Sequence, residues 1–333
     1  MMMLKIRRFV LYFRNCNIQI RESPVMKYAD LTAVAADLAV APPAFTVDPE
    51  RETALRRLDS LLGEADSENS PRLGRFYRER VDRALAEIAA YRGKTPRFWK
   101  LYSSGFVVKS ARRTLAVDIN GGCTPGRGRT RITLRDDQIR KLAELIDEYY
   151  CTHSHEDHIS APLCDALARR RKLIVMPAES IHRWLISGAT AAEELLCDHC
   201  RVFLNWQGNA SGGLDCAMYL FTLENGRTVM VRGDIYHGEG FDACMEHLRA
   251  WNLPVDYVFT SPYYTSGDDP IAALGREFAC RFVPIHEWEF SHRALGKPGP
   301  ATQCFAELYE KFDVWYQCGR AQFLTWGESI SLD

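Results

Sequence analysis

The chain has 333 residues, of which 47% are hydrophobic and 26% are charged, as in an ordinary globular protein. Its 42 Lys and Arg residues balance 43 Asp and Glu residues, which argues against a general nucleic-acid-binding protein. No apolar stretch reaches the roughly 18 residues that a membrane span needs, so we expect no membrane-spanning segment.

Eleven cysteines, an odd number, are scattered along the chain. Because a chain of this length can bury a core without disulfides, we expect reduced thiols and a cytoplasmic protein. The basic amino terminus has an apolar run from Phe9 to Phe13, shorter than the roughly 7–15 residues of a signal peptide. Met26 is an alternative start, which would make residues 1–25 an upstream extension.

The first elements along the chain are helical. Asp48 precedes Pro49 and a leucine repeat at helical spacing, which predicts a helix over 48–65 with Asp48 as its N-cap. The turn-rich stretch DSENSP separates it from a second predicted helix over about 72–92. These helices favour an extension that packs on a larger main domain.

From residue 98 onwards the pattern changes to strands. Strands and helices alternate, and hairpins such as the one around Asn225-Gly226 are also frequent. This mixture predicts an α/β sandwich with mixed sheets rather than a purely parallel sheet. The predicted strands are 98–110, 112–122, 149–152, 172–177, 216–224, 228–234, 255–262, 280–286 and a last pair within 320–332; the predicted helices are 135–150, 161–171 and 271–279.

The segment CTHSHEDHIS carries the strongest functional pattern. His153, His155, Asp157 and His158 form H-x-H-x-D-H between a predicted strand and a predicted helix. Imidazole nitrogen and carboxylate oxygen are ligands of Zn²⁺ and similar cations, and residues i and i+2 of an extended stretch point to the same side. The pattern therefore predicts a metal site, and the alternative is a polar turn whose histidines cap a helix.

With this motif the chain resembles the metallo-β-lactamase superfamily over roughly residues 98–333. The segments TLAVDINGG, VMVRGD and FVPIHEWEF resemble family strands in the same order, and the closing WGESISL resembles the G-E-x-x-x-L of a lactonase and phospholipase D-like branch. The resemblance implies an αββα sandwich over residues 96–333, with residues 1–95 as the helical extension. The metal ligands that it implies are His153, His155, Asp157, His158, Asp234 and His286, with Asp234 bridging two sites.

One position departs from the family pattern. The first site usually takes a third histidine from a G-H-x-x-G-G loop, and this chain has Asn209 there. Because an amide oxygen is a poorer zinc ligand than imidazole, we expect the second site to be more complete. The first site would be weak, empty or completed by His237 or Asp215. We expect one or two Zn²⁺ ions, with Mn²⁺ or Fe as alternatives.

The resemblance implies a hydrolase that uses a metal-activated water on a small ester, lactone or phosphodiester. Asp157 would bind one metal and orient the nucleophile. His292 is the first candidate for protonating the leaving group and His237 the second, because histidine has a pKa near neutrality. The expected partner is a small-molecule substrate, no nucleic acid is expected, and a homo-oligomer is compatible with the sequence.

Several alternatives stay open. Asn209 favours a catalytically degraded relative with a binding or scaffold role. A nuclease is disfavoured because the chain has no basic excess, and a secreted β-lactamase because it has no credible export signal. Tyr263, Tyr264 and Trp288 could line a substrate pocket, although core packing explains Trp288 equally well. The pair in CDHC, residues 197–200, has no second pair at zinc-finger spacing and is interpreted as two small buried thiols.

Overall fold

The computed structural model describes residues 27–63, 70–121, 132–206, 214–235, 238–261, 269–290 and 304–333. The helices are α1 (Tyr28–Val40), α2 (Pro49–Gly63), α3 (Ser70–Ala90), α4 (Asp136–Leu145), α5 (Ala161–Ala168), α6 (Ala178–Trp184), η1 (Ala192–Glu194), α7 (Gly238–Trp251), α8 (Pro270–Phe278), α10 (Phe305–Lys311) and α11 (Asp313–Gln317). The strands are β1 (Arg97–Lys100), β2 (Phe106–Lys109), β3 (Thr114–Val117), β4 (Glu148–Tyr150), β5 (Leu173–Met176), β6 (Thr190–Ala191), β7 (Cys200–Trp206), β8 (Asp215–Thr222), β9 (Thr228–Val231), β10 (Tyr257–Thr260), β11 (Arg281–Pro284) and β12 (Ser329–Ser331).

Within these residues the strands form two mixed sheets. The first has seven strands in the order β12-β1-β2-β3-β4-β5-β6, and β3 to β6 run parallel to one another. The second has five strands in the order β11-β10-β9-β8-β7, and β9 to β11 run parallel. The remaining neighbours are antiparallel, including the predicted hairpin of β8 and β9. The predicted mixed sheets are therefore confirmed.

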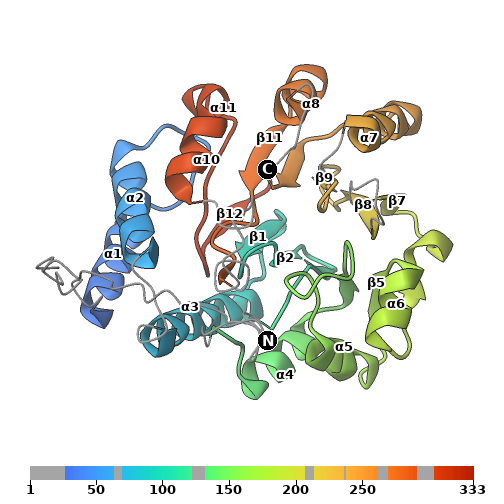
Figure 1. Ribbon diagram of the computed structural model, residues 1–333, viewed down its shortest axis with the longest axis horizontal. Coiled ribbons are helices and arrows are strands. Elements are labelled where there is room, and N and C mark those ends of the chain that lie inside the picture. Colours follow the sequence, from blue (N-terminus) through green and yellow to red (C-terminus); the bar gives the residue numbers. More distant parts are fainter. Residues whose placement is uncertain are drawn as a thin grey trace, which may run out of the picture.

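The two sheets pack face to face and helices cover their outer sides. Figure 1 shows α7, α8, α10 and α11 along one side of the sheets and α3, α4 and α5 along the other. Between the sheets, the Phe98 ring of β1 lies 4.6 Å and the Phe106 ring of β2 lies 5.0 Å from the Phe259 ring of β10. Apolar side chains on the inner faces thus form the core of an αββα sandwich.

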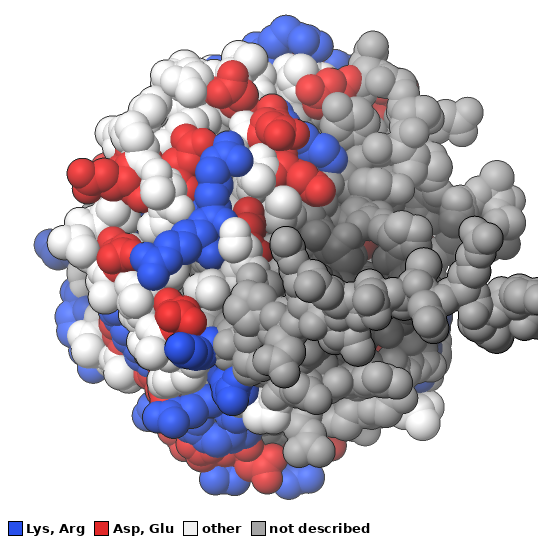
Figure 2. All heavy atoms as spheres, turned by 60° about the vertical axis from the view of Figure 1, so that its left-hand side comes forward, with Lys and Arg blue, Asp and Glu red and all other residues white. Residues whose placement is uncertain are grey.

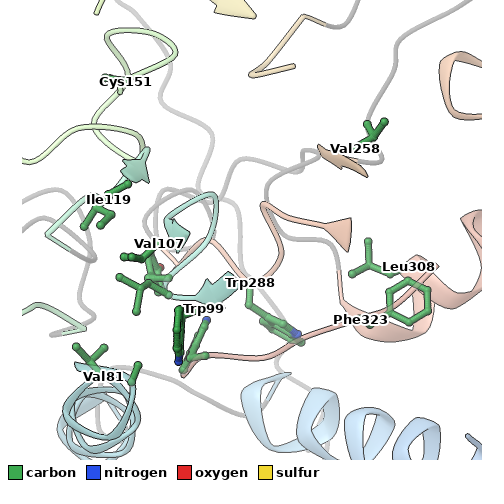
Figure 3. Close-up of a cluster of buried hydrophobic side chains, with 14 of the residues drawn as sticks. Val81, Trp99, Val107, Ile119, Cys151, Val258, Trp288, Leu308 and Phe323 are labelled. Carbon is green, nitrogen blue, oxygen red and sulfur yellow. The ribbon is translucent and has the colours of Figure 1, made fainter. Parts of the chain in front are cut away.

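The amino-terminal helices share a second apolar cluster with the first sheet. Figure 3 shows Val81 of α3 and Trp99 of β1 among the buried side chains of this cluster. A buried ion pair adds to the contact, because Arg51 of α2 bonds both carboxylate oxygens of Glu328 and the carbonyl oxygen of Phe323. Glu328 belongs to the closing G-E segment, so here that glutamate holds α2 to the sandwich. The division of the chain at residues 95 and 96 stays a prediction.

Helix α2 starts as its sequence predicts. The Asp48 carboxylate accepts a hydrogen bond from the backbone N–H of Arg51 at 3.0 Å, and Pro49 is the first helical residue. We expect Asp48→Ala to lower the free energy of unfolding by about 1 kcal/mol, because a helix N–H loses its acceptor. Urea unfolding measures the change. Asp48→Asn keeps an acceptor and should retain most of the stability, and equal losses in both variants would contradict the capping role.

The structure differs from the prediction in several local places. Helices α1, α6, α7, α10 and α11 were not predicted, although in α1 the buried Leu31, Val34 and Leu38 lie at helical spacing. The run 98–110 is two strands, since Leu101 and Gly105 close a tight turn between β1 and β2. The last pair is not a pair: Ala321 bridges Phe282 beside the second sheet, whereas β12 adds to the edge of the first sheet.

The side of the molecule that carries α1 and α2 has no single-sign field over its described part. Figure 2 shows Lys and Arg side chains interspersed with Asp and Glu there. Exposed ion pairs account for part of this mixture, as between Arg57 and Asp37 at 3.0 Å and between Arg75 and Glu79 at 2.9 Å. Among the described residues, no helix combines the length and the apolar character that crossing a membrane requires.

Candidate metal centre

The candidate site lies where parallel strands of both sheets end. In the first sheet, β3 is followed by Asp118 and β4 by the motif residues 151–158. In the second sheet, β9 is followed by Asp234 and β11 by His286. Because the carboxyl ends of parallel strands lie on one edge of a sheet, distant parts of the chain deliver polar side chains to one place.

Gly233 is required for the delivery of Asp234. Its φ is +61°, and a Cβ atom would lie 2.8 Å from Cys216 Sγ and 2.9 Å from Thr152 Cβ. A residue with a side chain would be strained in this left-handed backbone conformation and would clash with two buried neighbours. Glycine has no Cβ atom and avoids both problems. The Gly-Asp pair noted in the sequence therefore has a steric basis.

One group of potential ligands contains His153, His155 and Asp234. His153 Nε2 lies 3.0 Å from His155 Nδ1 and 3.6 Å from Asp234 Oδ2. His153 and Asp234 are buried, and His155 is half-buried. These three residues are the ones that the resemblance places at the first metal.

The other group contains Asp157, His158 and His286. His286 Nε2 lies 3.0 Å from Asp157 Oδ2 and 3.1 Å from His158 Nε2. All three side chains are buried. Asp234 Oδ2 also faces this group, at 3.5 Å from His158 Nε2 and 3.9 Å from His286 Nε2, so its carboxylate lies between the two groups.

Asp118 and Thr152 orient two of these histidines. The Asp118 carboxylate accepts hydrogen bonds from His158 Nδ1 at 2.9 Å and from the Thr152 hydroxyl at 2.8 Å. Because that hydroxyl has spent its proton on Asp118, it accepts from His153 Nδ1, 3.0 Å away. Both histidines therefore turn the lone pair of Nε2 towards the carboxylate of Asp234.

This donor set fits a divalent cation. Lone pairs of imidazole nitrogens and carboxylate oxygens converge within 4 Å of one another, and they would repel without protons or a cation between them. An outer carboxylate that holds the far nitrogen of a histidine is the usual support of a metal-binding imidazole. Asp118 lies in the family-like segment TLAVDINGG, but neither its role nor that of Thr152 was predicted from the sequence.

The close packing of imidazoles and carboxylates also shifts the pKa values of the site. Burial and the neighbouring His158 lower the pKa of His153 well below its ordinary value. Burial also acts to lower the pKa of His158, but the carboxylates of Asp157, Asp118 and Asp234 outweigh it and raise that pKa. For Asp234, burial acts upwards, but the imidazoles led by His286 lower its pKa. A cation bound among these groups would favour their deprotonated forms, so metal binding should release protons.

His286 reaches the site through an unusual backbone conformation. Its φ is +75°, and its N–H donates to the carbonyl oxygen of Ser103 at 3.2 Å. The same carbonyl oxygen accepts from the buried Lys100 ammonium, which pairs with Glu287 at 3.2 Å. A left-handed non-glycine residue is held by its surroundings at some cost, which is common at functional sites.

We expect Asp118→Ala to weaken metal binding about 10–100-fold, because His158 and His153 lose the group that orients them. Competition with a chelator of known affinity measures the change. Asp118→Asn keeps an acceptor oxygen but loses the charge, so its affinity should lie between those of the parent and of Asp118→Ala. An unchanged affinity in Asp118→Ala would contradict this role.

The structure thus brings together all six residues implied as ligands. It leaves out Asp215, whose backbone N–H donates to Glu179 and which belongs to neither group. Trp288 is a core residue (Figure 3). Its Nε1 donates to Asp59 of α2 at 2.7 Å. The other residues that the sequence singled out lie outside the described residues: His237, His292, Asn209, Tyr263, Tyr264 and the segment 1–25.

No family model and no curated protein matches the sequence. Solved structures do match. A possible metal-dependent hydrolase from Veillonella parvula is 12% identical with a TM-score of 0.52, over 73% of this chain and 100% of that one. Isothiocyanate hydrolase from Delia radicum gut bacteria is 14% identical with a TM-score of 0.52, over 70% of this chain and 98% of that one.

A weaker likeness extends to CmlA, a diiron β-hydroxylase from Streptomyces venezuelae, at 14% identity and a TM-score of 0.45, over 83% of this chain and 59% of that one. At such identities a structural likeness concerns the fold. The predicted αββα sandwich is confirmed by the two facing mixed sheets and their outer helices. Together with the likeness to metal-dependent hydrolases, this architecture shows that the chain has the metallo-β-lactamase fold.

Proposed function

We propose that the chain is a metal-dependent hydrolase that cleaves a small ester, lactone or phosphodiester. The observation that carries this proposal is the convergence of four imidazoles and two carboxylates at the strand ends. Zn²⁺ is the ion we propose, with Mn²⁺ or Fe as alternatives, because imidazole and carboxylate suit these cations. When bound, the ion would supply a water of lowered pKa and a positive charge beside the substrate.

The chain's own residues have distinct roles in this proposal. Asp157, His158 and His286 would hold the ion of the second group, and Asp234, whose carboxylate faces both groups, would contribute to it. Asp157 is 4% exposed and ionised carboxylates accept hydrogen bonds, so we propose that it also orients the attacking water. His292 and, second, His237 stay the proposed donors of a proton to the leaving group.

The alternative is a binding or scaffold protein that keeps the fold and one ion. Asn209 favours it, because the first group has three ligands among the described residues and its family counterpart has a further histidine. The two proposals differ in whether the bound ion turns over a substrate.

Metal content and hydrolysis, measured on the same preparation, test the proposal. Elemental analysis of protein purified without chelator should find about one tightly bound ion per chain at the second group. The same protein is then assayed for hydrolysis of a phosphodiester, a lactone and a thioester. An isothiocyanate is added to the panel because one structural neighbour is named for that substrate. Chelation should abolish activity and Zn²⁺, Mn²⁺ or Fe should restore it.

Each outcome decides between the alternatives. Metal-dependent turnover of any substrate in the panel supports the hydrolase. A tightly bound ion without turnover supports the binding protein. Protein that takes up no metal from a buffered excess overturns both. Two ions bound with equal affinity would contradict the expected weakness of the first group.

A further inference from the structure

A second group of reactive side chains lies at the opposite ends of the strands from the metal centre. Cys197 and Cys200 flank a turn at Asp198 and His199, directly before β7. His199 Nε2 lies 2.9 Å from Glu148 Oε2, and Glu148 is the first residue of β4, whereas the metal motif follows its last residue. The cysteine pair is therefore separate from the metal centre.

The turn holds the two cysteines at a spacing that a disulfide can bridge. A four-residue turn brings its first and last Cα atoms within about 7 Å, and disulfides span Cα distances of about 4.4–6.8 Å. Cys197 Sγ lies 3.7 Å from the carbonyl oxygen of Cys200, and Cys200 Sγ lies 3.7 Å from the carbonyl oxygen of Arg201. The turn therefore brings the two cysteines into the range in which a disulfide can close.

The two thiols differ in exposure. An attacking thiol must be accessible to the incoming disulfide, whereas the thiol that resolves the mixed disulfide can be buried. Cys200 is buried, and burial raises the pKa of its thiol. Cys197 is half-buried beside Leu196, which is 97% exposed, and a surface hollow of about 560 Å³ opens next to both cysteines. The incoming sulfur of a small molecule can therefore reach Cys197 first.

The surroundings of Cys197 favour its thiolate. The neighbouring Cys200 thiol outweighs burial and, with the charge of His199, lowers the pKa of Cys197 to about 6. His199 gains its positive charge from the hydrogen bond to Glu148, which raises the pKa of its imidazole. The other charged groups around the turn are Glu193, Asp198 and Arg201, with Arg113 behind Glu148.

We propose that Cys197 and Cys200 form a thiol–disulfide exchange site that reduces small aliphatic disulfides and closes to an internal disulfide. The Cys197 thiolate attacks one sulfur of the small disulfide. That S–S bond breaks, a mixed disulfide forms on Cys197, and the first small thiolate leaves and takes up a proton.

The buried thiol completes the exchange. Cys200 loses its proton and its sulfur attacks the Cys197 sulfur, so that the mixed disulfide breaks and the second small thiolate leaves with that proton. Two protein thiols are oxidised and one small disulfide is reduced to two thiols. No other oxidant is needed, because the small disulfide accepts both electrons.

Other features of the described chain disfavour simpler explanations. A metal site is disfavoured because neither potential metal group among the described residues includes these cysteines. Cys318 is an exposed cysteine with no second cysteine three residues away in the sequence. It therefore serves as an internal reference for the reactivity of an isolated exposed thiol. The proposal is independent of the hydrolase function, since it uses none of the metal-centre residues.

Alkylation rates test the nucleophile. At about pH 6, half of Cys197 should be thiolate against roughly 0.3% of an ordinary thiol with a pKa of about 8.5. A thiolate of lower pKa is a weaker nucleophile, which reduces the advantage in thiolate fraction about tenfold. We therefore expect iodoacetamide to modify Cys197 about tenfold faster than Cys318. Peptide mapping by mass spectrometry after a short exposure gives both rates in one sample, and equal rates would overturn the proposal.

Oxidised glutathione tests the exchange. In the folded protein, the peptide with both cysteines should lose two hydrogens as two equivalents of glutathione thiol appear. Cys200→Ser should stop at glutathione bound to Cys197, Cys197→Ser should bind no glutathione at Cys200, and Cys318→Ser should behave as the parent. A parent protein that stays a dithiol in excess oxidised glutathione, or that forms its disulfide between other cysteines, would overturn the proposal. If a serine variant does not fold, the disulfide mapped in the parent decides.

Discussion

His286→Ala is expected to remove the ion held with Asp157 and His158 and to lower metal-dependent hydrolysis about 10³-fold or more, since metal charge stabilisation is worth several kcal/mol. The His286 Nε2 atom lies 3.0 Å from Asp157 Oδ2 and 3.1 Å from His158 Nε2, so its loss removes one of the three ligands of this group. Asp157→Ala should have the same effect for the same reason. Elemental analysis and initial rates at saturating Zn²⁺ measure the two losses.

His182→Ala is a matched control, because His182 is an exposed histidine on α6 and belongs to neither potential metal group. This variant should keep the metal content and the rate of the parent. Full metal occupancy with full activity in His286→Ala would refute the assignment of the second group. Full occupancy with lost activity would place His286 in catalysis rather than in metal binding.

Lys100→Met is expected to lower the free energy of unfolding by about 3–5 kcal/mol, because it leaves the buried carboxyl group of Glu287 without its partner. The ammonium and the carboxylate are 3.2 Å apart and both side chains are at most 1% exposed. Burial raises the pKa of Glu287 to about 7 and lowers that of Lys100, and the attraction between the two groups offsets only part of each shift. Urea unfolding followed by circular dichroism measures the loss.

The double variant Lys100→Met with Glu287→Met should recover most of the lost stability, since removing both charges also removes their desolvation. Lys141→Met on α4 is the matched control, because Lys141 pairs with Glu144 in solvent and such pairs contribute little. If Lys100→Met is as stable as the Lys141→Met variant, the buried pair does not stabilise the fold. Lys100→Met should also weaken metal binding, because the Ser103 carbonyl that holds His286 loses its second donor.

Features with a local cause could be predicted from the sequence. The leucine spacing and the Asp48-Pro49 start predicted α2, and the Asn225-Gly226 turn predicted the hairpin of β8 and β9. The H-x-H-x-D-H motif indicated its chemistry because its four ligands lie within six residues and face one another through local backbone geometry. Asp234 and His286 came from the order of family landmarks, since no local pattern connects them with residues 153–158.

Tertiary structure decided which distant residues meet. Asp118 supports His158 because β3 lies beside β4 in the sheet, and neither strand carries that pairing in its own residues. Trp288 belongs to the core because α2 packs over it, and β12 pairs with β1 although more than 200 residues separate the two strands. Periodicity and turn chemistry act over a few residues, whereas strand order, burial and the pairing of charges depend on contacts between segments far apart in the chain.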